Sequence, residues 1–360
     1  MAVKKNELYS SLWASCDELR GGMDASQYKD YILTLLFIKY VTDKFKGDKY
    51  AEIIIPEKGS FDDIVALKGS KDIGEGIDKI IGKLAEVNNL QGVINNAHFN
   101  DKDKLGQGQE LVDKLTKLVS IFQRPELDFK NNRADGDDIL GDAYEYLMRH
   151  FATESGKSKG QFYTPAEVSR ILAKIIGINN IEKNKGKDII AYDPACGSGS
   201  LLIKLADEAP FGFSFYGQEK DNSTAGLAKM NFVLHNKAHG GVKYGCTFSD
   251  PQYFEPNSND TDLRRFDFVV ANPPFSTKNW TNGKNEYGRF DGYDAKPPEK
   301  NGDYAWLLHI LKSLKPKGKA AVILPHGVLF RGNAEAAIRK NIIDKGWIKS
   351  IIGLPANLFY

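Results

Sequence analysis

The chain has 360 residues, of which 41% are hydrophobic, and a formal net charge of +2. This length allows two domains, and so weak a positive charge excludes a protein that grips nucleic acid through electrostatics alone. The three cysteines are scattered without a C-x-x-C pair, which argues against a disulfide framework or a zinc cage and predicts a reducing, cytoplasmic setting.

The N-terminal region lacks the apolar core of a signal peptide. The longest apolar stretch, residues 31–41, contains Thr34 and Lys39 and is too short to span a bilayer. We therefore expect a protein without a membrane partner.

Apolar residues recur at helical spacing over residues 8–45, and Gly21 and Gly22 interrupt them. This pattern predicts a helical hairpin. Further helical patterns cover residues 77–87, 109–122 and 137–151, separated by Gly, Asn and Asp clusters. The sequence therefore predicts an all-α N-terminal domain over residues 1–152.

The pattern changes after a small polar loop at residues 153–160. Short β-branched runs then alternate with helical segments, and the predicted strands cover residues 188–192, 214–217, 266–271, 319–324 and 348–353. Alternation of strand and helix is typical of a doubly wound, mostly parallel sheet. We therefore predict an α/β domain over residues 153–360.

A glycine-bearing turn follows the first of these strands, in the sequence DPACGSGS. Two glycines one residue apart let the backbone turn tightly, and the helix that follows offers free N–H groups to a ligand. An ordinary strand-to-helix turn is the alternative. The predicted ligand-binding residues here are Asp193, Gly197, Ser198, Gly199 and Ser200.

The sequence also argues against two common nucleotide sites. The third glycine of a dinucleotide fingerprint is replaced by Leu202, and the chain has no Walker sequence. The next predicted strand leads into Glu219, twenty residues after Gly199, where a doubly wound fold places the carboxylate that binds ribose hydroxyls. A solvated loop acid is the alternative for Glu219.

The strand at residues 266–271 runs directly into Asn272, Pro273, Pro274 and Phe275. Consecutive prolines end the strand and direct the Asn272 amide and the Pro273 carbonyl to the carboxyl edge of the sheet. Two carbonyl acceptors on an aromatic amine would direct its lone pair toward an incoming methyl group. Phe275 would stack on an extruded base. A strand-ending turn with a buried Phe is the alternative.

Together these segments resemble the motifs of adenine-N6 DNA methyltransferases that serve as modification subunits of type I restriction systems. DPACGSGSL is similar to motif I and NPPF to motif IV, and QFYTPA with the helix after it is similar to motif X. The order X, I, IV is typical of the adenine-N6 branch. Segments in the first 152 residues and after residue 317 extend the resemblance over nearly the whole chain.

The resemblance implies S-adenosyl-L-methionine as cofactor, double-stranded DNA as substrate, and a specificity (S) and a restriction (R) subunit as partners. It also implies that motif X contacts the methionine end of the cofactor through Gln161, Phe162, Tyr163, Thr164, Pro165 and Ala166. The family has further C-terminal helices, so we expect the natural protein to continue beyond Tyr360.

One segment departs from the family pattern. Motif III usually has Asp or Asn facing the adenine of the cofactor, whereas this chain has GCTFSD over residues 245–250. Either Cys246 takes that position or Asp250 acts from a shifted loop.

Two weaker signals concern DNA and metal. Residues 276–300 mix Lys278, Trp280, Lys284, Tyr287, Arg289 and Tyr293 with four acids, which predicts either a DNA-gripping loop or a solvated one. His235 and His239 have the spacing of a metal pair but no third ligand, so we expect surface histidines and no metal.

The sequence thus predicts methyl transfer to N6 of an extruded adenine, with no metal and no covalent intermediate. This requires the turns at Gly197 and Asn272 to lie side by side on one sheet edge. Two alternatives are an amino-methyltransferase for protein glutamine or RNA, and a non-catalytic scaffold subunit.

Overall fold

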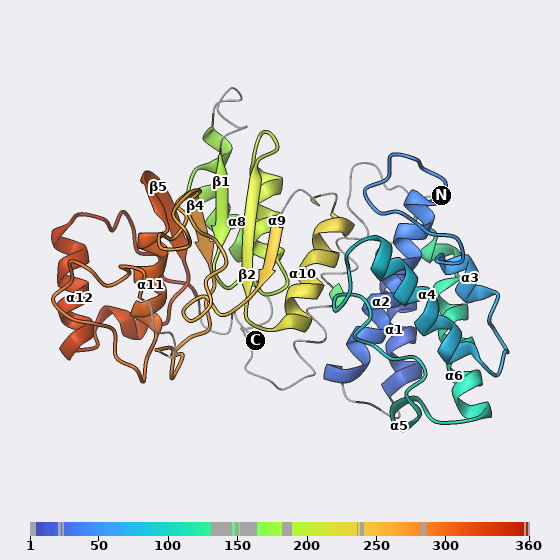
Figure 1. Ribbon diagram of the computed structural model, residues 1–360. Helices are drawn as coiled ribbons and strands as arrows, with labels where there is room; N and C mark the ends of the chain where they lie inside the picture. Colours follow the sequence, from blue (N-terminus) through green and yellow to red (C-terminus); the bar gives the residue numbers. More distant parts are fainter. Residues whose placement is uncertain are drawn as a thin grey trace. The chain divides into compact units, whose positions relative to one another are not determined.

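The computed structural model describes residues 5–20, 23, 25–130, 146–147, 151, 164–181, 189–235, 237, 241–281, 286–355 and 358. Its contacts divide the chain into two compact units (Figure 1). Unit 1 comprises Met1–Lys157 and Lys229–Ala238, and unit 2 comprises Ser158–Ala228 and His239–Tyr360. The predicted boundary at residue 153 lies outside the described residues and stays a prediction.

Unit 1 is helical, and residues 5–20 and 25–130 contain no strand. The predicted hairpin is confirmed, and Leu8, Leu12, Cys16 and Leu19 are fully buried on its first helix. The predicted helices at residues 77–87 and 109–122 are also present, whereas most of residues 137–151 lie outside the described part. The elements are α1 (Lys5–Arg20), α2 (Ala25–Phe45), α3 (Phe61–Val65), α4 (Ile73–Val87), α5 (Lys102–Leu105), α6 (Gln109–Phe122) and the 3-10 helix η1 (Pro125–Leu127).

Unit 2 contains a five-stranded, wholly parallel sheet in the order β3-β2-β1-β4-β5 (Figure 1). The predicted doubly wound α/β fold is therefore confirmed. Its strands are β1 (Ile190–Asp193), β2 (Ser214–Glu219), β3 (Gly241–Tyr244), β4 (Phe266–Ala271) and β5 (Leu314–Val322). Its other elements are α8 (Ala166–Ile175), η2 (Ile178–Asn180), α9 (Ser200–Glu208), α11 (Asp303–Lys312), η4 (His326–Leu329) and α12 (Asn333–Asp344). The division between the two units falls within α10 (Asn222–Leu234), after Ala228.

Both faces of the central strands are buried. Val269 and Ala271 point to one face of the sheet and cluster with Ile310 of α11, whereas Val270, between them, is buried on the other face. Helix α9 packs against β1 and β4, and α8 packs against α9 and β5. The chain reverses its direction of winding between β1 and β4, the place where doubly wound sheets open a crevice for ligands.

One strand prediction was wrong, one strand was missed, and one begins earlier than predicted. Residues 348–353 form no strand, and Ile351 and Ile352 are exposed, because this apolar run pairs with no strand among the described residues. The sequence also gave no sign of β3, whose only buried residue is Val242. This edge strand lacks the apolar alternation that identifies a strand, and only its pairing with β2 defines it. In addition, β5 begins at Leu314, five residues before the predicted start at residue 319.

Within the described residues, we find no helix that combines the length and the apolar character needed to cross a membrane.

The close approach of β2 to the turn after β1 yields a stability test. A Cβ atom on Gly217 would lie 2.8 Å from Cys196 Sγ and 3.3 Å from Val242 Cγ2. We expect Gly217→Ala to lower the free energy of unfolding by about 1 to 3 kcal/mol through overpacking, measured by urea denaturation. Gly212→Ala is the control, because a Cβ atom there meets nothing within 4 Å. Equal stability of the two variants would contradict this packing.

Candidate methyl-transfer site

The turn after β1 has the sharp geometry that its glycines predicted. Gly197 has φ 54° and Gly199 has φ 80°, both in the left-handed region that favours glycine. Helix α9 begins at Ser200, and the hydroxyls of Ser198 and Ser200 lie 3.0 Å apart in a buried position. The turn therefore brings a glycine backbone and the N-terminus of a helix to the carboxyl edge of the sheet.

Glu219 reaches this turn from the end of the neighbouring strand β2. Its Oε2 atom accepts a hydrogen bond from the Gly197 N–H at 3.0 Å, and its Oε1 atom accepts one from the Asp221 N–H at 2.9 Å. Burial raises the pKa of Glu219, against the opposing effect of these bonds. The structure thus brings together two of the residues predicted to hold a nucleoside.

Asp193 ends β1 directly beneath the turn. Its side chain is only 2% exposed and accepts a hydrogen bond from the Ala195 N–H at 2.9 Å. Burial raises the pKa of Asp193 to about 8, and the nearby charge of Glu219 adds to the rise. At neutral pH the protonated form is favoured, because ionisation would place a second negative charge in a desolvated site.

The loop at residues 245–250 forms a further side of this region, and the buried side chain of Gln218 holds it. Gln218 Nε2 donates to the carbonyls of Gly245 and Asp250, both at 3.0 Å, and Oε1 accepts from the Gln252 N–H at 3.1 Å. Sequence reasoning missed Gln218. A polar residue in a strand expected to be buried on both faces was the available signal.

The same loop contacts the glycine turn through Thr247, whose hydroxyl donates to the Pro194 carbonyl. Cys246 is half-buried. Burial raises the pKa of its thiol, but hydrogen bonds from Ser249 and Phe248 outweigh this, so that the net pKa is lowered. Asp250 is exposed. The alternative between Cys246 and Asp250 as the adenine contact stays open.

The tetrapeptide after β4 lies at the same edge of the sheet. Asn272 Nδ2 donates to Thr164 Oγ1 at 3.2 Å, which joins the tetrapeptide to the segment that leads into α8. Pro273 is buried, Pro274 is half-buried, and Phe275 is 38% exposed. Pro165 and Ala166 also lie in this described segment, as the N-cap and first residue of α8. Gln161, Phe162 and Tyr163 lie outside the described residues.

A buried acid fixes the turn that follows Phe275. Ser276 has φ 52°, and its N–H donates to Asp303 Oδ1 at 2.6 Å. Asp303 is fully buried and forms an ion pair with Arg331, which also pairs with Glu335. Sequence reasoning missed Asp303 and Arg331, because Asp303 meets Ser276 and Arg331 across separations of 27 and 28 residues along the chain.

The turns at Gly197 and Asn272 lie at one edge of the sheet, as the predicted mechanism required. Strands β1 and β4 are neighbours and parallel, with Tyr192 opposite Val269, so that their carboxyl ends point the same way. The glycine turn leaves β1 after Asp193, and the tetrapeptide leaves β4 after Ala271. The spatial premise of the predicted site is therefore confirmed.

Two weaker predictions need correction. Trp280 and Arg289 are buried, with Trp280 Nε1 bonded to the Pro298 carbonyl at 2.9 Å, so they do not form a solvated or DNA-gripping surface. Lys284 and His239 lie outside the described residues. His235 follows the last residue of α10 and is buried rather than exposed, with its Nδ1 atom 3.0 Å from the Asn231 carbonyl of that helix.

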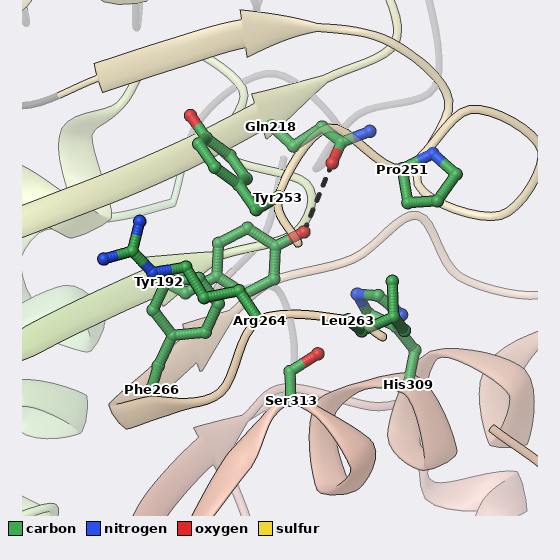
Figure 2. Close-up of a pocket in the computed structure, with 9 residues that line it drawn as sticks. All are labelled: Tyr192, Gln218, Pro251, Tyr253, Leu263, Arg264, Phe266, His309 and Ser313. Carbon is green, nitrogen blue, oxygen red and sulfur yellow. Dashed lines mark hydrogen bonds between the residues drawn. The ribbon is translucent and has the colours of Figure 1, made fainter. Parts of the chain in front are cut away.

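A small hollow in the aromatic core beneath the sheet edge is distinct from this site. It is lined by Tyr192, Gln218, Pro251, Tyr253, Leu263, Arg264, Phe266, His309 and Ser313 (Figure 2). None of the predicted catalytic or cofactor residues lines it. Gln218 connects the two regions, since Figure 2 shows the Tyr192 hydroxyl bonded to its Oε1 atom, at 3.4 Å.

The buried acid Asp193 yields a pH test. The folded chain keeps its proton up to a pH of about 8, whereas the unfolded chain loses it near pH 4. Between these values the folded state binds more protons, so the free energy of unfolding falls as the pH rises. Asp193→Asn keeps the acceptor for Ala195 and removes this titration.

We therefore expect the stability of the wild type, relative to Asp193→Asn, to decrease from pH 5 to pH 8 in urea denaturation. Parallel pH profiles for the two proteins would show that Asp193 is ionised throughout.

Comparison with known proteins identifies the family. The profile of the N-6 DNA Methylase family matches residues 135–360, and that of the HsdM N-terminal domain matches residues 8–122. The type I restriction enzyme MpnII methylase subunit of Mycoplasma pneumoniae is 30% identical, over 99% of this chain and 74% of its own length. The type I restriction enzyme MjaVIII methylase subunit of Methanocaldococcus jannaschii is 33% identical, over 99% of this chain and 63% of its own length.

Among solved structures, the chain is similar to the type I restriction-modification system methyltransferase subunit from Streptococcus thermophilus. The TM-score is 0.80 and the identity 30%, over 99% of this chain and 82% of the other.

Proposed function

The chain belongs to the N-6 DNA methylase family, among the methylase subunits of type I restriction enzymes, and we propose that it transfers a methyl group from S-adenosyl-L-methionine to N6 of an adenine in double-stranded DNA. The observation that carries this proposal is the shared sheet edge of the glycine turn and the Asn272 tetrapeptide. We further propose that a specificity subunit supplies DNA recognition and that a restriction subunit completes the complex.

The residues around the glycine turn suit the cofactor. A nucleoside needs a carboxylate for its ribose hydroxyls and a backbone that it can approach closely. Glu219 already lies against the Gly197 N–H, and the left-handed glycines with buried Ser198 and Ser200 leave main chain, rather than bulky side chains, facing the edge. Cys246 or Asp250 would face the adenine. S-adenosyl-L-methionine supplies a methyl group that is reactive toward an amine nitrogen.

Asn272 and Pro273 act on the target amine. An amine conjugated to an aromatic ring is a weak nucleophile, and two carbonyl acceptors on its hydrogens keep the lone pair on nitrogen. The bond from Asn272 Nδ2 to Thr164 orients the amide, so that its oxygen keeps the acceptor role. Pro273 supplies the second carbonyl, and Pro274 holds the extended path that directs it.

Phe275 binds the extruded base. The residue is 38% exposed, so part of its side chain is accessible to a base. Base–aromatic stacking contributes about 1 to 3 kcal/mol, which is comparable to the cost of taking a base out of the helix. The Ser276–Asp303 bond fixes the backbone next to this ring.

Substitution of Asn272 separates binding from catalysis. We expect Asn272→Ala to bind S-adenosylhomocysteine within about twofold of the wild type and to lose at least about a hundredfold in methyl transfer, as the loss of one preorganised polar contact does in other enzymes. Calorimetry and a tritium-transfer assay measure the two effects. Asn341→Ala is the control, because that amide bonds to Asp294 outside the site. Unchanged turnover in Asn272→Ala would remove this residue from the mechanism.

The acceptor is tested directly. The chain and its specificity partner are incubated with tritiated cofactor and either unmethylated DNA or ribosomal protein and RNA. We expect label in DNA, at N6 of adenine. Label only in protein or RNA would identify the alternative amino-methyltransferase, and a chain that binds no cofactor would identify a scaffold subunit.

A further inference from the structure

Arg289 is the one buried residue among the described lysines and arginines, with 3% of its surface exposed. Taking a guanidinium out of water is unfavourable unless its donors are matched by acceptors. The methyl-transfer roles above do not use Arg289. Its burial within the catalytic unit therefore needs a physical reason.

Its hydrogen bonds converge on the loop at residues 245–250. Arg289 Nη2 donates to the Thr247 carbonyl at 2.7 Å, and Nη1 donates to the Phe248 carbonyl at 3.3 Å. Nε donates to His309 Nδ1, on α11, at 3.0 Å. Burial, with the nearby Arg289 charge, lowers the pKa of His309 well below its usual value, so the ring is neutral and Nδ1 accepts. Burial lowers the pKa of Arg289 only to about 10, which keeps its charge at neutral pH.

The aromatic surroundings hold the guanidinium at this point. It lies 5.2 Å from the ring centroid of Tyr287 and 5.7 Å from that of Phe248. Phe248 in turn packs against Trp280 and Trp306, at centroid distances of 5.5 Å and 4.6 Å. Cation–π contacts of this kind stabilise a desolvated arginine. The segment that follows the tetrapeptide is therefore packed onto the loop that follows β3.

The Thr247 and Phe248 carbonyls that Arg289 binds belong to no helix or strand, since residues 245–250 form turns. Thr247 lies at the centre of this arrangement. Its carbonyl accepts from Arg289, while its hydroxyl donates to Pro194, three residues before Gly197. Arg289 is thus connected to the glycine turn through Thr247. It also restrains the position of Cys246, which precedes Thr247 in the chain.

We propose that Arg289 is a positioning residue for the cofactor: it holds the 245–250 loop against the glycine turn and so links the segment after the target-base tetrapeptide to the cofactor side of the site. This inference rests on the proposed function, because it takes the glycine turn as the cofactor site. Arg289 touches neither substrate nor reacting atoms in this role, and its effect is on cofactor affinity.

The test is calorimetric titration of the full chain with S-adenosylhomocysteine, which yields the dissociation constant and the number of sites separately. Arg289→Met removes all three donors and keeps an unbranched side chain. We expect its dissociation constant to rise about tenfold or more, with one site per chain retained. A purely structural role would instead lower the number of competent sites and leave the dissociation constant unchanged.

Arg289→Lys is the conservative variant, with one charged donor in place of the planar fork. We expect it to bind with an affinity between those of the wild type and Arg289→Met, and it provides the measurement if Arg289→Met does not fold. The matched control is Arg264→Met, because that guanidinium stacks on Tyr216, at 4.4 Å, in the same unit. We expect the control to bind within about twofold of the wild type.

Wild-type affinity in both Arg289 variants, or equal weakening in Arg264→Met, would overturn the positioning role while the proposed function stands. A wild-type chain that binds no S-adenosylhomocysteine would overturn the proposed function itself.

Discussion

The parallel pairing of β1 with β4 is the constraint on which the rest of the site depends. These two strands lie where the chain reverses its winding, and parallel strands end at one edge. The glycine turn continues from β1 and the tetrapeptide continues from β4. A buried strand pair, covered on one face by Ile310 of α11 and packed against α9, supplies a rigid base for both.

Polar side chains, rather than backbone ladders, hold the loops that rise from this edge. Gln218 binds two carbonyls and one N–H of the 245–252 segment, Arg289 binds two further carbonyls there, and Asp303 binds the Ser276 N–H. Buried backbone groups outside helices and strands must find partners elsewhere, because an unmet group costs about 1 to 3 kcal/mol. Loop shape and loop stability are therefore determined by the same few side chains.

Two features near the carboxyl edge of the sheet would each, on their own, destabilise the folded state. Ser276 has a left-handed backbone that non-glycine residues rarely adopt, and Asp193 is an acid without solvent. Such features persist only where surrounding contacts over-determine them, and they cluster at functional sites. Here the Asp303 carboxylate, itself paired with Arg331, stabilises the Ser276 turn. Asp193 is accommodated because its raised pKa favours the protonated form, which places no charge in the desolvated turn.

The sequence by itself determined the parts of this protein that depend on local pattern. Helical periodicity identified α1, α2 and α6, and glycine spacing and consecutive prolines located both turns, because backbone preferences act over a few residues. Only the tertiary structure decided which distant groups meet. It paired β3 with β2 although its sequence is polar, and it left the apolar run at residues 348–353 without a strand partner. It buried Arg289 and Trp280 in a segment whose composition suggested a solvated or DNA-gripping surface. It also revealed Gln218, Asp303 and Arg331, since a hydrogen bond between residues far apart in the chain leaves no periodic signal in the sequence.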